Sequence, residues 1–139
     1  MIDIAIAERG EAEAAQLFAL ARSAFGDRPS WDDRRVLDVL LRDLLFIARE
    51  GGSVAGYAAL SPRRETVVVE QLLVATGHER RGVGRRLLAH AEGYAIGRRA
   101  KSLQIVVEGD NRPARAFYRR VGFTPVGGDV FELLLPRPA

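Results

Sequence analysis

The chain has 139 residues, of which 47% are hydrophobic and 28% charged, and this balance predicts a single globular domain over residues 1–139. Two histidines and no cysteine exclude a disulfide framework and a thiolate metal site, so we expect no metal. The net charge of +3 comes from arginine, since Lys101 is the only lysine. No apolar run approaches the roughly 20 residues that span a bilayer, and the N-terminus lacks a signal-peptide pattern. We therefore expect a cytoplasmic protein without a membrane partner.

The first half of the chain has the pattern of a strand, two helices and three strands. Alternating side chains predict the first strand, and apolar stripes at helical spacing predict the helices, the second of them capped by Ser30. Three short apolar runs joined by tight turns predict an antiparallel meander. These elements are expected at residues 2–7, 11–25, 30–41, 45–49, 54–60 and 67–74.

The second half has the pattern of a helix, a strand, a helix and a hairpin. A strand at residues 102–107 follows a strand–helix unit, so it should lie parallel to the strand at residues 67–74. Asp110 or Asn111 is expected to cap the last helix, and Gly122 followed by Phe123 is typical of a helix stop. The whole pattern predicts an α/β (α+β) fold: a mixed, mainly antiparallel sheet of six to seven strands, with about four helices on both faces. The exposed edge of the final hairpin could serve a homodimer.

A turn rich in glycine and arginine separates the strand at residues 67–74 from the next helix. Gly82 and Gly84 stand at the helix start, where backbone N–H groups have no internal partner and the helix dipole is positive. Four arginines surround them, at positions 80, 81, 85 and 86. The turn lacks the third glycine of a dinucleotide fingerprint and the Lys-Ser/Thr pair of a P-loop. We interpret it as a site for a pyrophosphate-bearing ligand; the alternative is a tight turn without a ligand.

Two sequence blocks together resemble the GNAT superfamily of acetyl-CoA-dependent N-acyltransferases. The first is ERRGVGRRLL, which follows the strand EQLLV, and the second is NRPARAFYRRVGF. The matching positions are Gly82, Gly84, Asn111, Ala114, Phe117, Tyr118, Gly122 and Phe123. Glu79 departs from the pattern, since the family usually has Arg or Gln there, and its carboxylate would have to point away from the phosphates.

This resemblance implies the acyl-CoA N-acyltransferase fold and acetyl-CoA as the cosubstrate, without a metal. It implies that two strands splay apart and that the pantetheine arm pairs with the backbone of Leu72, Leu73 and Val74 in the gap. One backbone N–H there would polarise the thioester carbonyl. Asn111, Ala114 and Tyr118 would contact the arm. The turn that holds the phosphates, chiefly through backbone N–H groups, would comprise Glu79, Arg80, Arg81, Gly82, Val83, Gly84 and Arg85.

Two catalytic side chains are expected, Tyr118 from its place in the second block and Glu70 from its place in an otherwise apolar strand. Tyr118 is the candidate general acid for the leaving thiolate, since a phenol pKa of roughly 10 exceeds a thiol pKa of roughly 8.5. Its alternative role is that of a core aromatic. Glu70 is the candidate base that takes a proton from the amine, and strand alternation places it on the face of Leu72 and Val74. It could instead lie on a solvated face, with Glu108 or Asp110 as the base.

The expected acceptor is a primary amine, bound near residues 25–31 and attacking the thioester directly. Whether Trp31 faces the acceptor is left open by the sequence. A second reading is a non-catalytic acyl-CoA-binding or interaction module on the same fold. A nucleic-acid partner is not expected, because no basic run is interleaved with exposed aromatic residues.

Overall fold

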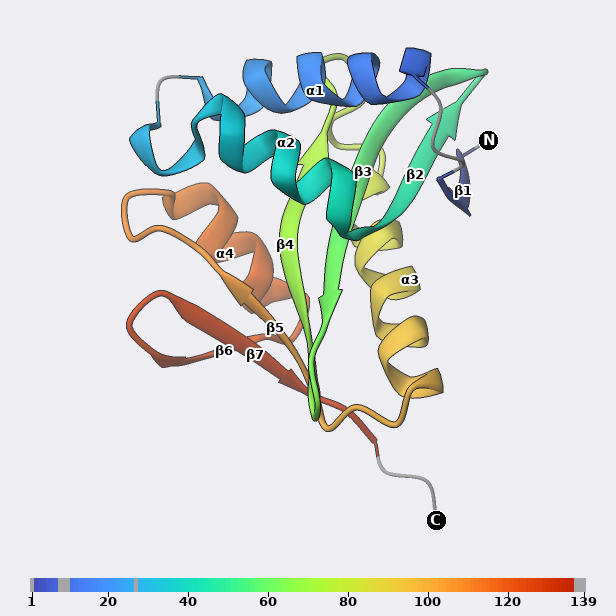
Figure 1. Ribbon diagram of the computed structural model, residues 1–139. Helices are drawn as coiled ribbons and strands as arrows, with labels where there is room; N and C mark the ends of the chain where they lie inside the picture. Colours follow the sequence, from blue (N-terminus) through green and yellow to red (C-terminus); the bar gives the residue numbers. More distant parts are fainter. Residues whose placement is uncertain (1, 8–10, 27, 137–139) are drawn as a thin grey trace.

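A seven-stranded mixed sheet forms the centre of the protein (Figure 1). The computed structural model describes residues 2–7, 11–26 and 28–136. In these residues the strands are β1 (Ile2–Ile6), β2 (Leu44–Glu50), β3 (Ser53–Pro62), β4 (Thr66–Val74), β5 (Ser102–Val106), β6 (Thr124–Gly127) and β7 (Val130–Leu134). The helices are α1 (Glu11–Phe25), the 3-10 helix η1 (Pro29–Trp31), α2 (Asp33–Arg42), α3 (Val83–Gly97) and α4 (Arg112–Arg120).

The strand order is β1-β2-β3-β4-β5-β7-β6, and each neighbouring pair is antiparallel except β4 and β5. The parallel pair follows from the chain path, because α3 carries the chain from the end of β4 back to the start of β5. The expected α/β class, with a mainly antiparallel sheet of six to seven strands, is confirmed.

Each face of the sheet is covered by one pair of helices, and each pair buries its own core. Helices α1 and α2 pack on one face around Leu17, Val36 and Tyr57. Helices α3 and α4 pack on the other around Leu87, Val67 and Tyr118 (Figure 1). The apolar spacing of each helix accounts for this division, because residues three and four apart in a helix share one face.

The ends of two helices show how local sequence sets the loops that border the sheet. Helix α2 is capped by Asp32, which accepts a hydrogen bond from the Arg35 N–H (2.9 Å), and not by Ser30. Pro29 begins the short turn η1, so Ser30 lies before the helix rather than at its start. Helix α4 ends as expected: Gly122 adopts φ 103°, and the Phe123 N–H donates to the Tyr118 carbonyl (2.9 Å).

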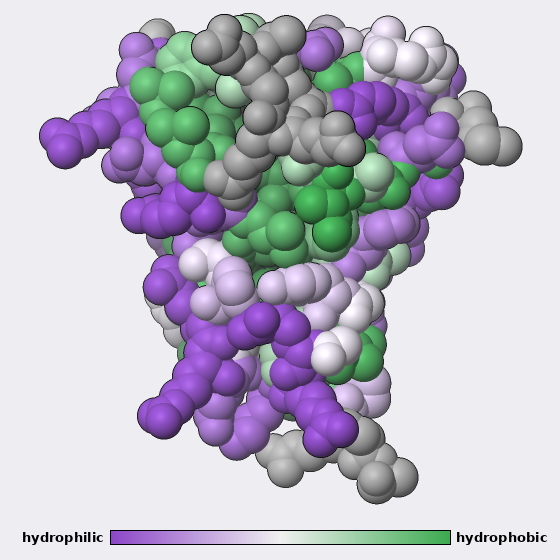
Figure 2. Space-filling view, turned by 45° about the vertical axis from the view of Figure 1, so that its right-hand side comes forward, coloured by the Kyte–Doolittle hydropathy of each residue, from purple (hydrophilic) through white to green (hydrophobic). Residues whose placement is uncertain are grey.

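The surface offers no single feature that identifies a protein partner. Large hydrophobic side chains are exposed on six different elements, at Ile6, Leu37, Leu41, Ile96, Val106, Val126 and Leu134. The face in Figure 2 has hydrophobic side chains gathered in the middle of its upper half, with hydrophilic ones on both flanks and below. Scattered apolar groups are normal on protein surfaces, so the homodimer stays a prediction.

Among the residues described, no helix is long and apolar enough to cross a bilayer, and no cluster of three or more His, Cys, Asp or Glu could bind a metal.

Asp43, directly after α2, carries a buried carboxyl group whose ionisation should weaken the fold. Burial, and then the charge of Glu70, raises the pKa of Asp43 to about 6, and the residue is 4% exposed. Because burial raises the folded-state pKa, the protonated carboxyl group stabilises the fold fully below the unfolded-state pKa. This stabilisation is lost as the pH rises through the folded-state pKa of about 6. We expect the free energy of unfolding of Asp43→Asn, relative to that of the wild type, to increase by up to about 3 kcal/mol as the pH is raised from 4 to 7.

Urea unfolding of both proteins at a series of pH values measures this gain. Asp38→Asn, which changes an exposed carboxylate on the same helix, is the matched control. A difference between Asp43→Asn and the wild type that does not vary with pH would contradict the assignment.

Candidate active site

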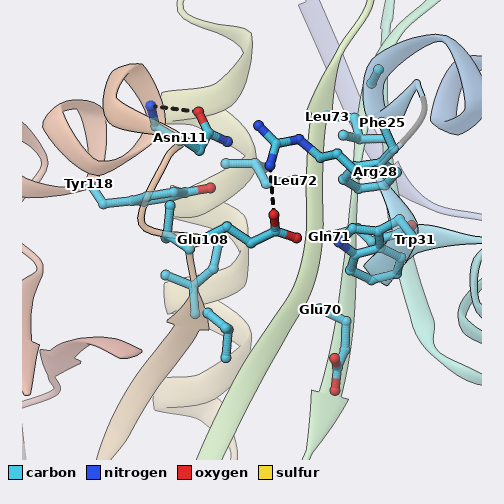
Figure 3. Close-up of a pocket in the computed structure, with 15 residues that line it drawn as sticks. Phe25, Arg28, Trp31, Glu70, Gln71, Leu72, Leu73, Glu108, Asn111 and Tyr118 are labelled. Carbon is cyan, nitrogen blue, oxygen red and sulfur yellow. Dashed lines mark hydrogen bonds and ion pairs between the residues drawn. The ribbon is translucent and has the colours of Figure 1, made fainter. Parts of the chain in front are cut away.

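The strands β4 and β5 separate halfway along their length, and a cavity of about 270 Å³ lies in the gap (Figure 3). Their pairing runs from Thr66–Ser102 to Val69–Ile105 and stops there, although β4 continues to Val74. Residues 70–73 line one side of the cavity, residues 105–108 the other, and α4 contributes Asn111, Ala114 and Tyr118. The splayed strands expected from the sequence are therefore present.

A β-bulge in β4 changes the direction of the side chains at the cavity. Val69 pairs with Leu60 and Gln71 with Ala59, which leaves Glu70 as the extra residue. Val69 and Leu72 both pack on the α3/α4 side of the sheet, so Glu70 and Gln71 between them both face the α1/α2 side. The expectation that Glu70 shares a face with Leu72 and Val74 is wrong, because it assumed unbroken alternation.

Glu70 nevertheless lines the cavity. Its side chain is 22% exposed and forms an ion pair with the Arg63 guanidinium (3.4 Å). Tyr118 reaches the gap from the α3/α4 face with its hydroxyl directed into it, and Glu70 lies on the opposite face of the sheet with its carboxylate directed away from that hydroxyl (Figure 3). A proton transfer from an amine in the gap to Glu70, directly or through water, stays a prediction.

Alternate residues of β4 direct their backbone polar groups into the gap. The Ala75 N–H donates to the Ala55 carbonyl of β3 (2.7 Å), so the Val74 and Leu72 groups point the opposite way, toward β5. The Leu73 carbonyl lies against Gly56 of β3, and an added Cβ at Gly56 would clash with it. Leu72 and Val74 thus offer backbone hydrogen-bonding groups to a ligand in the gap, whereas Leu73 lines the cavity with its side chain.

Tyr118 is the most deeply buried polar side chain contributed by α4 to the cavity. The residue is 5% exposed, its ring has edge contacts with Phe117 and Phe123, and its hydroxyl points into the gap (Figure 3). In the described part of the chain this hydroxyl has no hydrogen-bond partner. Burial raises the pKa of Tyr118 above its ordinary value, so the phenol stays protonated at neutral pH.

The glycine turn leaves the N-terminus of α3 open. Gly82 is the N-cap residue with φ 78°, and no side chain caps the helix. The residues of the turn before it are exposed, and the first N–H groups of α3 have no side-chain cap. Val83 is buried, so it could contact a ligand only through its backbone. Gly84 packs against Phe117 and Val74. These features fit a pyrophosphate, because an uncapped helix N-terminus binds anions.

The charged residues of the turn differ in whether they already have a hydrogen-bond or ion-pair partner. The Glu79 carboxylate accepts a hydrogen bond from the Gly77 N–H (3.0 Å), so it is occupied within the turn. Arg81 pairs with Glu50 (3.2 Å), whose pKa is lowered by the His78 hydrogen bond and by Arg81. Among the described residues, Arg80, Arg85 and Arg86 have no ion pair. Those three arginines are the ones available to a phosphate.

Asn111 caps α4, since its side-chain oxygen accepts from the Ala114 N–H (3.4 Å), and both residues also line the cavity. The capping role that the sequence indicated is present, and a contact with the pantetheine arm is sterically open. Pro113 follows in the first turn, where a missing N–H does no harm.

The sequence did not predict the link that crosses the mouth of the cavity. Arg28, before η1, donates to Glu108 (2.6 Å) and Asp110 (3.1 Å), both after β5, and the Ser30 hydroxyl donates to Glu108 (Figure 3). Glu108 and Asp110 are therefore ion-paired. Trp31 lines the cavity, stacked on Phe25 with ring centroids 4.6 Å apart. In the sequence, this link was indicated only by the opposite charges of Arg28 on one side and of Glu108 and Asp110 on the other.

Comparison with known proteins agrees with this geometry. A model of the acetyltransferase (GNAT) family matches residues 13–123. A streptothricin acetyltransferase of Streptomyces lavendulae is 40% identical over 80 residues, 56% of this chain and 42% of that protein. A mycothiol acetyltransferase of Beutenbergia cavernae is 32% identical over 127 residues, 84% of this chain and 43% of that protein. The matched segments thus span less than half the length of these two relatives.

The fold also matches a solved structure. A GNAT family acetyltransferase from Elizabethkingia anophelis with acetyl-CoA bound superposes with a TM-score of 0.77. The match covers 96% of this chain and 98% of that chain at 18% identity, so it is a likeness of the fold alone. With the family model over residues 13–123, the split between β4 and β5 and the open N-terminus of α3, the chain belongs to the GNAT family of acetyltransferases.

Proposed function

We propose that this protein transfers an acetyl group from acetyl-CoA to a primary amine by direct attack. The observation that carries the proposal is the gap between β4 and β5, which the Tyr118 hydroxyl enters from one face while Glu70 lines it from the other. A thioester in this gap would meet backbone groups of Leu72 and Val74, and its phosphates would lie at the uncapped N-terminus of α3. We infer no covalent enzyme intermediate, since the chain has no cysteine.

The proposed chemistry requires two proton transfers by side chains of this protein. Glu70 takes a proton from the ammonium group of the acceptor, which makes the amine nucleophilic. The amine then forms the new C–N bond as the C–S bond breaks, and Tyr118 donates its proton to the departing sulfur. Tyr118 recovers a proton from the amide nitrogen or from water, so one proton is released per acetyl group transferred.

The cosubstrate is tested by thermal unfolding with increasing acetyl-CoA. A ligand that binds the folded state alone stabilises it by about 2.7 kcal/mol at 100 times Kd, which raises Tm by several degrees. We expect this rise, and a smaller one with acetyl-pantetheine, which lacks the pyrophosphate for the α3 N-terminus. No rise in Tm at millimolar acetyl-CoA would contradict the proposed cosubstrate.

The alternative, a non-catalytic acyl-CoA-binding module, predicts the same rise in Tm but no chemistry. Thiol release from acetyl-CoA, followed across a panel of small amines and peptides, separates the two. Release that depends on the amine supports the transferase, and binding without release from any amine supports the module.

A further inference from the structure

Gln71 is a buried amide beside the catalytic residues that the proposed reaction does not use. It is 2% exposed and lines the cavity between β4 and β5. Its Oε1 accepts a hydrogen bond from the Tyr57 hydroxyl (2.5 Å), and its Nε2 has no partner among the described residues. A buried donor left without a partner destabilises the fold, so native proteins seldom keep one without a function for it.

Tyr57 fixes which end of the Gln71 amide is unsatisfied. Tyr57 is fully buried, and burial raises its pKa, so the hydroxyl keeps its proton and needs an acceptor. Donation to Gln71 Oε1 meets that need and leaves one unsatisfied group, Nε2. The reversed amide would leave both the Tyr57 proton and the Gln71 oxygen unsatisfied. The unsatisfied group is therefore the NH₂ group, a donor of two hydrogen bonds, which lies below the accessible surface in a side chain that lines the cavity.

The bulge sets this donor next to the proposed base. Glu70 and Gln71 are consecutive and face the same side of the sheet, because the bulge interrupts the alternation between them. A carboxylate suited to an ammonium group and an amide donor suited to an oxygen thus lie one residue apart. An α-aminoacyl group has its nitrogen and its carbonyl oxygen in the same close relation.

Charge favours a neutral oxygen over a carboxylate. The carboxylates of Glu70 and Glu108 line the cavity, and its one lining cation among the described residues, Arg28, already pairs with Glu108 and Asp110. A free amino acid would bring its carboxylate into this negative field, whereas the carbonyl of an amide or peptide carries no charge. A carbonyl oxygen can accept one hydrogen bond from the Gln71 NH₂ group.

We propose that Gln71 is a specificity residue whose Nε2 donates to the carbonyl oxygen next to the reacting amine, so that the acceptor is an α-aminoacyl amide such as a peptide N-terminus. This inference rests on the proposed acetyl transfer.

The test compares three acceptors that share a CH₃–CH(NH₂)– group: alaninamide, which carries a carboxamide on it, sec-butylamine, which carries an ethyl group of similar size, and alanine, which carries a carboxylate. In the wild type we expect kcat/KM for alaninamide to exceed that for each of the others by at least about tenfold. Gln71→Leu should lower the ratio of alaninamide to sec-butylamine about tenfold and leave the KM for acetyl-CoA within about twofold. The two amines differ in basicity, but this difference enters the ratio equally in the wild type and in the variant. A change in the ratio between the two proteins therefore does not come from basicity.

Two further variants complete the design. Gln104→Leu makes the same change on β5, where the amide donates to Glu132 (2.7 Å) outside the cavity, and it should keep the wild-type ratio. Tyr57→Phe frees the Gln71 amide to rotate and should lower the ratio in part, which gives a second route if Gln71→Leu folds poorly. An unchanged ratio in Gln71→Leu and Tyr57→Phe overturns the role of Gln71. Absence of thiol release with every acceptor overturns the proposed function instead.

Discussion

Replacing Tyr118 by phenylalanine should lower kcat by about 10²-fold or more and leave the Kd of acetyl-CoA almost unchanged. Loss of a general acid typically costs 10²- to 10⁴-fold in rate. The substitution removes one oxygen atom and keeps the ring between Phe117 and Phe123, so the core should stay packed. Steady-state kinetics with a saturating amine, together with calorimetric titration of acetyl-CoA, measure the two quantities separately.

Tyr94→Phe is the matched control for this experiment. Tyr94 lies on α3, where its ring contacts Phe46 and Arg98 outside the cavity, so loss of its hydroxyl should not alter kcat. A Tyr118→Phe protein with wild-type kcat would show that the residue serves the core alone.

Replacing Glu70 by glutamine should lower kcat by about 10²-fold and abolish the fall of kcat at low pH. Only a carboxylate can accept the proton, so the wild-type rate should decline at low pH. Glutamine cannot ionise, and the variant should therefore show no such decline. The measurement is kcat against pH at a saturating amine, because saturation removes the contribution of the free acceptor's own ionisation.

Glu65→Gln makes the same change outside the cavity, where Glu65 pairs with Lys101 (3.0 Å). It should reproduce the wild-type profile. If Glu70→Gln also keeps the low-pH decline, Glu70 is not the base. Glu108 and Asp110 both pair with Arg28 at the mouth of the cavity, at 2.6 and 3.1 Å, which is closer than the 3.4 Å between Glu70 and Arg63.

Most of the secondary structure could be predicted because its signals are local. Apolar spacing located the four α-helices and the strands to within a few residues but not the 3-10 helix η1, and the Gly122–Phe123 stop of α4 follows from glycine at a positive φ. The predicted N-cap of α2 was wrong, because two residues close together in the sequence can both cap a helix. Ser30 and Asp32 are both good caps, and Pro29 decides between them by starting η1 ahead of the helix.

The sequence by itself determined the family and the elements that carry the site. Its two blocks, with Gly82 and Gly84 in one and Asn111 and Tyr118 in the other, identified the GNAT family, which the family model confirms. Local patterns suffice for this, because an uncapped helix N-terminus and a capped helix are each built from a few consecutive residues.

The tertiary structure alone decided how the site is arranged. The bulge at Glu70 depends on how β3 pairs with β4, and it turns both Glu70 and Gln71 toward the α1/α2 face. The unsatisfied Gln71 amide depends on Tyr57, 14 residues away, and the Arg28–Glu108 link joins residues 80 apart. Contacts over such separations arise from the register and packing of the whole sheet, which no local pattern in the sequence contains.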